Sequence, residues 1–310
     1  MASRLIAIVG PTAAGKSTLA LRLACEQPAE VVSCDSLQVY RDFDVGSAKP
    51  TPGERRGVPH HLLDIVDPDG TFSAADYVRQ ARRVAREIAA RGRIPLLVGG
   101  TGLYFRAFFR GLFEGPARDE ALRRRLEGMA ERFGDERLHR LLRHVDPVAA
   151  SRIAPRDRVR VVRALEVLRA TGRPIGEHHR NGARPLEGFE ILCIGLDPGR
   201  EALRRAVAAR AREMLSRGLV EETRGLIERY GERARRPLGA IGYRQAAAYL
   251  RGELDEEGLY RELVTETMRY AKRQMTWFRR EPSVLWYADA GAALAAVGAW
   301  LASPPMPPNH

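Results

Sequence analysis

The chain has 310 residues, of which 45% are hydrophobic and 29% are charged. This composition is typical of a globular protein of about two domains, and no run of ~18 apolar residues indicates a membrane span. Cys25, Cys34 and Cys193 are an odd and widely spaced set, which excludes a disulfide framework and a zinc knuckle. The net charge of +12 favours nucleic acid or phosphorylated ligands as partners. No export signal is visible, so we expect a cytoplasmic protein.

Three short apolar runs in the first third of the chain predict strands of a parallel sheet, at residues 5–9, 30–34 and 94–98. The first run leads into a glycine-containing turn and a helical run over 16–25. Ser73 precedes an amphipathic run, so its hydroxyl is a candidate helix cap. The order strand, helix, strand predicts βαβ crossovers.

The strand pattern stops at Pro116, and arginine-rich helical periods follow over 120–133, 136–145 and 157–170. A strand returns at 189–196, helices are predicted from 200 to 280, and a last strand at 283–287 precedes a Pro-rich tail that we expect to be disordered. The pattern therefore predicts an α/β core formed by residues 1–116 and 189–310, with an all-helical insertion domain at 117–188.

A phosphate-binding motif lies between the first predicted strand and the first predicted helix. Its pattern, G-x-x-x-x-G-K-[ST], is that of the P-loop. Its backbone N–H groups and the helix N-terminus favour a diphosphate or triphosphate, Lys16 adds a positive charge, and Ser17 is a candidate magnesium ligand. The motif predicts a P-loop NTPase-like core but not a reaction. The predicted diphosphate-binding residues are Gly10, Pro11, Thr12, Ala13, Ala14, Gly15, Lys16, Ser17 and Thr18.

Further segments with a characteristic composition occur along the whole chain. They are DSLQVY at 35–40, GSAKP at 46–50, PHHL at 59–62, GGTGLY at 99–104, RALE at 163–166, GYRQ at 242–245 and AKRQMTW at 271–277. In this consistent order, they resemble the tRNA dimethylallyltransferase family, which is also called the IPP transferase family. The resemblance implies transfer of a dimethylallyl group from its diphosphate to N6 of the adenine on the 3′ side of the anticodon, with Mg²⁺ as cofactor. It is most similar to the compact bacterial type, which we expect to be a monomer.

The resemblance also implies catalytic roles. Asp35 matches the general base, Lys16 and Thr101 match groups at the reacting diphosphate, and Arg224 matches an arginine that assists the diphosphate, with Arg212, Arg217 and Arg229 near it in the sequence. From position alone, Asp35 is equally a turn aspartate or a residue that orients magnesium. Its place at the end of the second predicted strand puts it at the carboxyl edge of the sheet, where open α/β folds bind ligands.

The resemblance implies a tRNA-binding surface as well. Gln38 matches the residue that reads the target base, since its amide suits an adenine edge. Arginines at 152, 156, 160 and 163 suggest a basic helical stripe on the insertion. The predicted tRNA-binding residues are Asp35, Ser36, Leu37, Gln38, Thr101, Arg123, Val159, Arg160, Val161, Val162, Arg163, Gly242, Tyr243, Arg244, Lys272, Arg273 and Gln274.

Three other functions fit parts of the pattern. A P-loop small-molecule kinase would need ATP, with Asp35 holding a metal and the insertion acting as a lid. An adenylate isopentenyltransferase would prenylate free AMP and would not need the Arg-rich insertion. A non-catalytic RNA-binding protein would leave the combination of Lys16, Ser17, Asp35 and Thr101 unexplained.

Overall fold

The structure, a computed structural model, describes residues 2–112, 115–116, 119–181 and 184–304. The chain divides into two compact units. The α/β unit comprises Met1–Phe108 and Leu186–His310, and the helical unit comprises Phe109–Pro185. Among the described residues, no helix combines the length and apolar character needed to cross a membrane.

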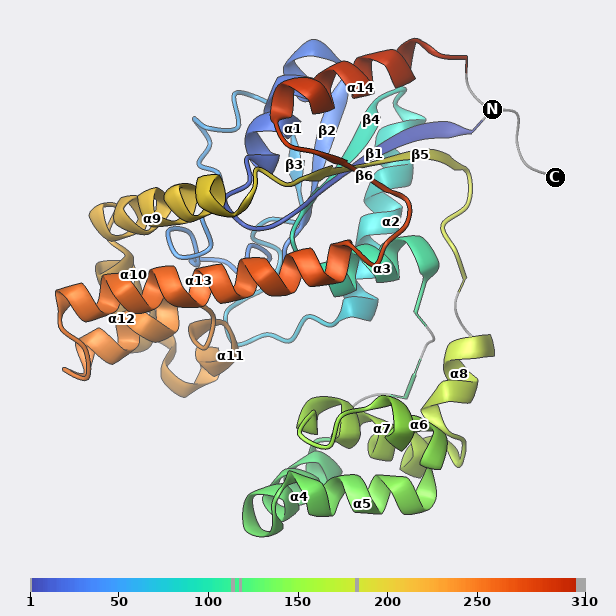
Figure 1. Cartoon of the computed structure of the whole chain (residues 1–310), viewed down its shortest axis with the longest axis vertical. Helices are drawn as coiled ribbons and strands as arrows, with labels where there is room; N and C mark the ends of the chain where they lie inside the picture. The colour runs from blue at the N-terminus through green and yellow to red at the C-terminus, as the bar shows by residue number, and fades with distance from the viewer. Residues whose placement is uncertain (1, 113–114, 117–118, 182–183, 305–310) are drawn as a thin grey trace. The chain divides into compact units, whose positions relative to one another are not determined.

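The α/β unit is built on one parallel sheet with the strand order β3-β2-β4-β1-β5-β6 (Figure 1). The strands are β1 (Ser3–Val9), β2 (Ala29–Cys34), β3 (His60–His61), β4 (Ile94–Gly99), β5 (Phe189–Leu196) and β6 (Val284–Tyr287). The predicted parallel α/β core is confirmed. The two-residue edge strand β3 was not predicted, because two histidines carry no strand pattern.

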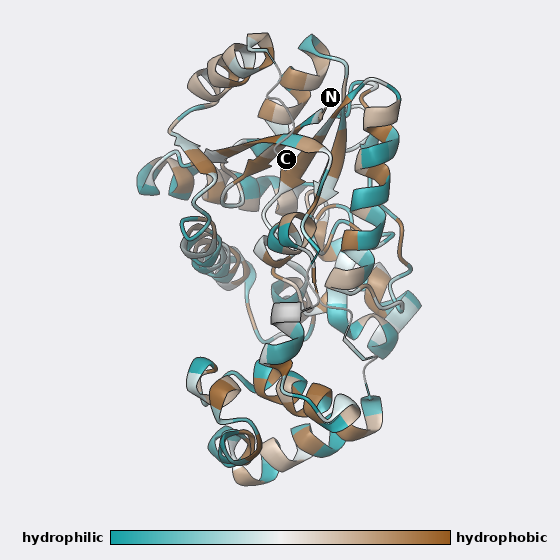
Figure 2. Ribbon diagram, turned by 90° about the vertical axis from the view of Figure 1, so that its right-hand side faces the viewer, coloured by the Kyte–Doolittle hydropathy of each residue, from teal (hydrophilic) through white to brown (hydrophobic). Residues whose placement is uncertain are grey.

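Helices cover both faces of the sheet, which explains why its strands are apolar on both sides (Figure 2). Helices α1 (Lys16–Glu26) and α14 (Ala290–Ala302) share one hydrophobic core with alternate residues of the strands. Helix α2 (Ala74–Ala90) packs on β2 and β4 on the opposite face. The predicted cap of α2 is confirmed, since the Ser73 hydroxyl accepts a hydrogen bond from the Asp76 backbone N–H and the Asp76 carboxylate accepts one from the Ser73 N–H.

A further group of helices lies beyond the carboxyl ends of the strands, where open α/β sheets bind ligands. In Figure 1, α9 and α13 run side by side, and α10 packs against α12. The remaining helices of this unit are α3 (Gly102–Arg110), α9 (Arg200–Ser216), α10 (Leu219–Tyr230), η1 (Gly231–Ala234), α11 (Arg235–Leu238), α12 (Tyr243–Leu250) and α13 (Glu256–Phe278).

The helical unit has its own hydrophobic core, which includes Leu126, Leu138, Leu142, Val161 and Leu165. Its helices are α4 (Glu120–Phe133), α5 (Asp135–Val145), α6 (Pro147–Arg152), α7 (Arg158–Thr171) and α8 (Ile175–Asn181). The predicted helices at 120–133, 136–145 and 157–170 are confirmed to within one residue at each end. The predicted arginine stripe does not form on one helix. Helix α7 begins after residue 157, which leaves the arginines at 152 and 156 on other segments.

Candidate active site

A cavity of about 400 Å³ lies at the carboxyl edge of the sheet, and all of its lining residues belong to the α/β unit. Seven segments of the chain form its walls. They are the P-loop after β1, the chain after β2, the loop at 46–48, residues 98–100 at the end of β4, one face of α9, residues 239–241 before α12 and one face of α13. Polar and apolar groups both face the interior, so the cavity suits a ligand with a charged end and a hydrocarbon end.

The P-loop has the backbone expected of a phosphate-binding turn. Gly10 has a φ of +137°, and a Cβ there would lie 2.6 Å from the Leu196 carbonyl oxygen, so no other residue fits. Gly15 has a φ of +87° and precedes α1, whose N–H groups point towards the loop. Of the nine residues predicted to bind diphosphate, Thr12, Lys16 and Ser17 line the cavity with their side chains or backbone. Ser17 is exposed and accessible to a ligand.

The Lys16 ammonium lies inside the cavity and donates a hydrogen bond to the Pro11 carbonyl oxygen at 2.7 Å. Burial and the nearby Arg210 guanidinium lower the pKa of Lys16 to about 7, although Asp35 acts in the opposite sense. Two cationic side chains therefore face one small space. That arrangement is costly without an anion and favours a diphosphate.

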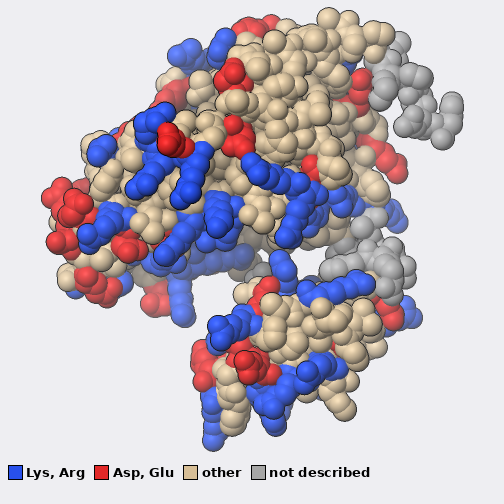
Figure 3. All heavy atoms as spheres, viewed as in Figure 1, with Lys and Arg blue, Asp and Glu red and all other residues tan. Residues whose placement is uncertain are grey.

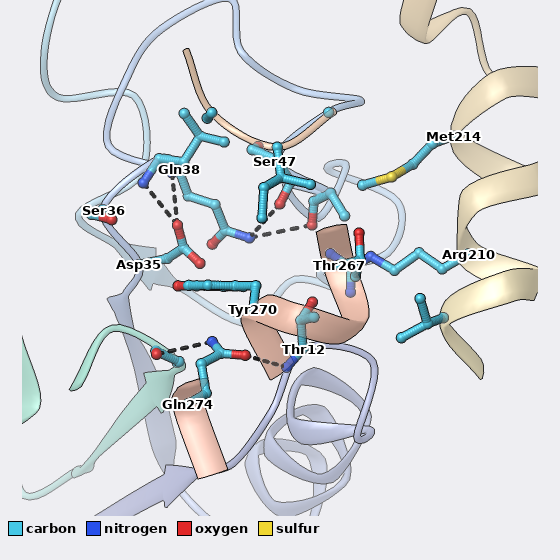
Figure 4. Close-up of a pocket in the computed structure, with 18 of the residues that line it drawn as sticks. Thr12, Asp35, Ser36, Gln38, Ser47, Arg210, Met214, Thr267, Tyr270 and Gln274 are labelled. Carbon is cyan, nitrogen blue, oxygen red and sulfur yellow. Dashed lines mark hydrogen bonds between the residues drawn. The ribbon is translucent and has the colours of Figure 1, made fainter. Parts of the chain in front are cut away.

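Asp35 follows β2 directly and lines the cavity. Its Oδ1 accepts hydrogen bonds from the backbone N–H groups of Leu37 at 2.8 Å and Gln38 at 3.3 Å, which fix the orientation of the carboxylate. Figure 4 shows this carboxylate beside the Tyr270 ring. Asp35 therefore forms a turn, and its carboxylate also reaches the cavity. The sequence left open whether Asp35 forms a turn or acts on a ligand. The structure supports both, because one carboxylate oxygen binds the turn and the residue also lines the cavity.

Thr101 lies at the start of α3, beside Asp35 but outside the lining of the cavity. Its backbone N–H donates to the Cys34 carbonyl at 3.2 Å, and its hydroxyl accepts from the Ser36 N–H at 3.1 Å. Thr101 thus joins the ends of β4 and β2. The Thr101 hydroxyl is thereby fixed against Ser36, the residue after Asp35, and its predicted contact with the reacting diphosphate stays a prediction.

Arg210 of α9 lines the cavity, whereas the predicted Arg224 is not among the lining residues. Helix α9 presents Val207, Arg210, Ala211 and Met214 to the cavity, which is a spacing of three and four residues along one helix face. Arg224 is exposed on α10, whose buried positions are Leu219, Thr223 and Leu226. The sequence signal that would have found Arg210 is this apolar stripe, since Arg210 lies within it.

Helix α13 contributes side chains that the sequence did not single out, Thr267 and Tyr270, and two that it did, Arg273 and Gln274. Burial and the Asp35 carboxylate raise the pKa of Tyr270 well above its ordinary value, so the phenol stays neutral. Gln274 is buried, and its amide makes one hydrogen bond to the backbone through each of its polar atoms. It therefore holds the walls of the cavity together, and its predicted contact with tRNA stays a prediction.

Gln38 lines the cavity with its amide in one orientation. Its Nε2 donates to the carbonyl oxygens of Ser47 and Ala48, each at 3.3 Å, and its Oε1 accepts from the Ser33 hydroxyl at 3.1 Å (Figure 4). Both N–H bonds are used, so the carbonyl oxygen is the part of the amide with spare capacity.

The comparisons with known proteins agree with this geometry. Residues 38–281 match the family described as IPP transferase. The chain belongs to the IPP transferase family. It is 48% identical over 294 residues to a tRNA dimethylallyltransferase of Koribacter versatilis, with 95% of each chain covered, and 48% identical over 292 residues to one of Geobacter metallireducens, with 93% and 94% covered. The predicted resemblance is confirmed.

Solved structures of the family have the same fold. The tRNA isopentenylpyrophosphate transferase of Bacillus halodurans superposes with a TM-score of 0.70 at 39% identity, covering 97% of this chain and 96% of that one. A eukaryotic dimethylallyltransferase described as acting on tRNA gives a TM-score of 0.78 at 26% identity, covering 98% and 81%. The predicted α/β fold class is thereby confirmed.

A magnesium ion, which the family resemblance implies, would take most of its ligands from its substrate. Mg²⁺ prefers oxygen ligands and usually combines one or two protein groups with phosphate oxygens and water. Among the described residues, no group of three or more His, Cys, Asp or Glu is arranged to hold a metal. The Ser17 hydroxyl and the Asp35 carboxylate line the same cavity and are oxygen donors. This donor set fits a magnesium ion that binds together with a diphosphate.

Of the three tRNA-binding residues predicted near α12, Gly242 and Tyr243 are buried and Arg244 lies on the surface. Tyr243 is fully buried, and its hydroxyl donates to Glu222 Oε1 at 2.5 Å. Gly242, with a φ of +97°, precedes α12 and is bonded to Gln245. Arg244 is exposed and paired with Glu266. The GYRQ segment is therefore a helix start whose tyrosine points inward, which its sequence alone does not reveal.

In the helical unit, the predicted contact segment divides between core and surface. Val161 and Val162 are buried in the hydrophobic core, so they are not available to RNA. Val159 is 73% exposed, and the Arg160 side chain is 63% exposed. The division follows the 3.6-residue period of α7, in which Val159 and Arg160 lie on the solvent side while Val161 and Val162 turn to the core.

Arg123 is not a free basic residue either. Its guanidinium makes a two-pronged ion pair with the buried Glu166, with N–O distances of 2.7 and 3.1 Å. Arg163 approaches the same carboxylate at 3.9 Å and donates to the Pro116 carbonyl. This pairing uses two of the five N–H donors of Arg123 inside the unit, and the tRNA contact there stays a prediction.

On the α/β unit, basic side chains gather along α13 (Figure 3). Lys272 and Arg273 are exposed there, and Arg273 also lines the cavity. Trp277 on the same helix is half-buried beneath the Arg106 guanidinium, 4.3 Å from ring centroid to carbon. The Arg106 guanidinium therefore covers part of this indole.

Proposed function

We propose that this protein transfers the dimethylallyl group of dimethylallyl diphosphate to N6 of the adenine on the 3′ side of the anticodon in tRNA, and releases diphosphate. The observation that carries the proposal is the arrangement of Asp35, Lys16 and Arg210 around one cavity. A carboxylate able to accept a proton faces two cations able to hold a leaving diphosphate. Relatives named tRNA dimethylallyltransferase support the choice of donor and acceptor.

The diphosphate would lie in the P-loop. Lys16, Arg210 and the N–H groups at the start of α1 would bind it, and their positive charge would stabilise the negative charge that develops as the allylic C–O bond breaks. Arg210 takes the role that the sequence assigned to Arg224. Mg²⁺ bound by the Ser17 hydroxyl and the phosphate oxygens would supply further positive charge at the leaving group. The electron pair of the broken bond remains on the diphosphate.

The allyl group would lie against the apolar face of α9 and α13. Val207, Ala211, Met214 and Leu263 line that part of the cavity. These side chains would exclude water from the carbon that loses its oxygen, which protects the allylic cation character from hydrolysis. The acceptor amine then meets this carbon and no competing nucleophile.

The adenine amine is a weak nucleophile, because its lone pair is delocalised into the ring. As the new N6–carbon bond forms, one N6 proton would pass to the Asp35 carboxylate. The Leu37 and Gln38 N–H groups that bind Oδ1 hold this carboxylate in place. An adenine in an anticodon loop is unpaired, so it can leave its stack and enter a pocket.

The test mixes purified protein, Mg²⁺, labelled dimethylallyl diphosphate and unmodified tRNA that carries an adenine beside its anticodon. Parallel reactions contain AMP in place of tRNA, or ATP in place of the prenyl donor. Label in tRNA supports the proposal. Label in AMP supports the adenylate isopentenyltransferase, and phosphate transfer from ATP supports the kinase. A reaction without Mg²⁺ tests whether transfer requires the metal. We also propose that the active species is a cytoplasmic monomer.

A further inference from the structure

One loop forms the roof over Gln38 and is held from two sides. Residues 44–49, here called the roof loop, supply Gly46, Ser47 and Ala48 to the lining of the cavity. Ala48 has a φ of +45°, so the loop keeps an unfavourable backbone conformation that its surroundings must stabilise.

The outer anchor of the roof loop is Glu222 on α10. Its carboxylate accepts hydrogen bonds from three successive backbone N–H groups, those of Asp44 at 3.2 Å, Val45 at 2.8 Å and Gly46 at 3.2 Å. The Tyr243 hydroxyl donates to the same carboxylate at 2.5 Å. Successive N–H groups that converge in this way form a concave site for an anion, and the charge strengthens each bond.

The inner anchor is Lys49, whose side chain is only 3% exposed. Its ammonium donates to Asp44 Oδ1 at 2.6 Å, Asp64 Oδ1 at 2.5 Å and the Tyr40 carbonyl at 2.9 Å. The backbone of the roof loop is therefore fixed at both ends. Ser47 and Ala48, which lie between the anchors, have little freedom to turn their carbonyl groups.

Packing reinforces the outer anchor. A Cβ at Gly46 would lie 2.5 Å from the Tyr243 ring and 2.9 Å from Leu219 Cδ1. Phe43 meets the Tyr243 ring edge to face, with 4.7 Å between centroids. The roof loop thus rests directly on the α10 and α12 pair, and Glu222 sits at the centre of that contact.

The two carbonyl groups held in this way are the acceptors that use both N–H bonds of the Gln38 amide. We propose that Glu222 is a positioning residue that sets the orientation of Gln38 through the roof loop. Gln38 is thereby left with its carbonyl oxygen as the acceptor for a hydrogen-bond donor on the incoming base. The inference rests on the proposed function, because it takes Gln38 as the residue that faces the target base.

The consequence is a specific kinetic signature. Within the described part of the chain, the hydrogen-bond partners of Glu222 are the roof loop and Tyr243, not the P-loop, so its neutralisation should leave the diphosphate site intact. Glu222→Gln keeps one acceptor oxygen but puts an N–H₂ group against the backbone donors. We expect kcat/KM for an anticodon stem-loop RNA to fall about tenfold or more, with KM for dimethylallyl diphosphate unchanged. Glu228→Gln, an exposed site on the same helix, is the matched control and should behave as wild type.

A double-mutant cycle with Gln38→Ala separates positioning from a general structural effect. If Glu222 acts through Gln38, Glu222→Gln should lower kcat/KM for the stem-loop RNA only slightly when Gln38→Ala is already present. The inference would be overturned if Glu222→Gln lowered kcat/KM equally in wild type and in Gln38→Ala. It would also be overturned if Glu222→Gln raised KM for dimethylallyl diphosphate by a similar factor. Gly46→Ala displaces the same loop by contact with Tyr243 and without a change of charge, so it should give the same coupling to Gln38 if Glu222→Gln folds poorly.

Hydrogen exchange supplies a measurement that does not depend on the reaction. The amides of residues 44–46 should exchange faster in Glu222→Gln than in wild type, and unchanged protection would refute the anchor. If wild-type protein transfers no prenyl group to RNA, the proposed function fails. In that case the affinity for stem-loop RNA is measured for Glu222→Gln, Gln38→Ala and the double variant. If the losses of affinity in the two single variants add up in the double variant, the inference is overturned.

Discussion

Gln274 of α13 accepts a hydrogen bond from the backbone N–H of Thr12 in the P-loop, with 2.8 Å between Oε1 and N. Its Nε2 also donates to the Gly100 carbonyl at 2.9 Å, so one buried amide joins the P-loop to the end of β4. A Cβ on Gly100 would lie 2.1 Å from this Nε2, which leaves no room for another residue. The distance between the two loops that frame the diphosphate site is therefore set by a residue 262 positions from Thr12.

We expect Gln274→Ala to raise KM for dimethylallyl diphosphate about tenfold and to lower the free energy of unfolding by about 1–3 kcal/mol, because two buried backbone groups lose their partner. Gln274→Glu is the informative companion, since a carboxylate still accepts from Thr12 but cannot donate to Gly100. Initial-rate kinetics and urea unfolding measure the two effects. A KM rise of equal size for tRNA would instead point to direct RNA contact by Gln274.

Asp35→Asn should lower the rate of the chemical step by about 10²-fold or more, because the amide cannot take the N6 proton. The amide oxygen can still accept from the Leu37 and Gln38 N–H groups, so the turn and tRNA affinity should be preserved. Single-turnover rapid quench, with tRNA affinity measured separately, distinguishes the two. A near-normal single-turnover rate would remove Asp35 as the base, and Asp35→Ala tests whether the turn matters as well.

The lowered pKa of Lys16, about 7, makes diphosphate binding depend on pH. A bound diphosphate favours the ammonium form and raises this pKa, so the protein takes up a proton when it binds above pH 7. Affinity for inorganic diphosphate should therefore fall as pH rises above 7, by up to about tenfold per unit. Lys16→Arg stays charged throughout this range, so titration calorimetry with the same ligand should give a flatter profile. If diphosphate affinity fell with pH in the same way in wild type and in Lys16→Arg, the pH dependence would not come from Lys16.

Arg210 and Arg224 form a natural pair of test and control. Arg210→Gln removes a cation from the cavity and should lower kcat/KM for dimethylallyl diphosphate about 10²-fold. Arg224→Gln changes an exposed residue of α10 and should have little effect. Because burial lowers the pKa of Arg210, its loss should also stabilise the empty protein slightly, as seen by thermal unfolding. The reverse ranking of the two variants in kcat/KM would restore the sequence-based assignment.

Local patterns predicted much of this site because its chemistry is encoded in short segments. The P-loop and Asp35 each follow a buried strand, so the carboxyl edge of a parallel sheet necessarily brings them together. Arg210 was missed because its place depends on which face of α9 packs against α13, and the sequence contains arginines on every side of that helix. Gln274 was assigned to tRNA through the family resemblance of its segment, and its hydrogen bonds to backbone groups distant in the sequence gave no local signal.

In the helical unit, too, local patterns do not show which residues are exposed on the surface. Helix boundaries were predictable from the 3.6-residue period, but the division of Val159 to Arg163 into core and surface requires the register of α7 on its neighbours. The pairing of Arg123 with Glu166 was beyond the pattern, since residues 43 positions apart give no local signal. An arginine-rich composition therefore overstates how many arginines are free to bind RNA.

Substitution of Arg160 should therefore change RNA binding, whereas substitution of Arg123 should change the stability of the fold. Arg160→Ala removes an exposed charge and should weaken stem-loop RNA binding and reduce its salt dependence by about one phosphate contact, with stability unchanged. Arg123→Met leaves the buried Glu166 carboxylate with only the more distant Arg163, and should lower the free energy of unfolding by about 3 kcal/mol. Glu166→Gln in the Arg123→Met background should recover part of that loss, because it removes the unpaired charge. If Arg123→Met instead unfolds like wild type and loses RNA affinity at every salt concentration, Arg123 belongs to the RNA surface after all.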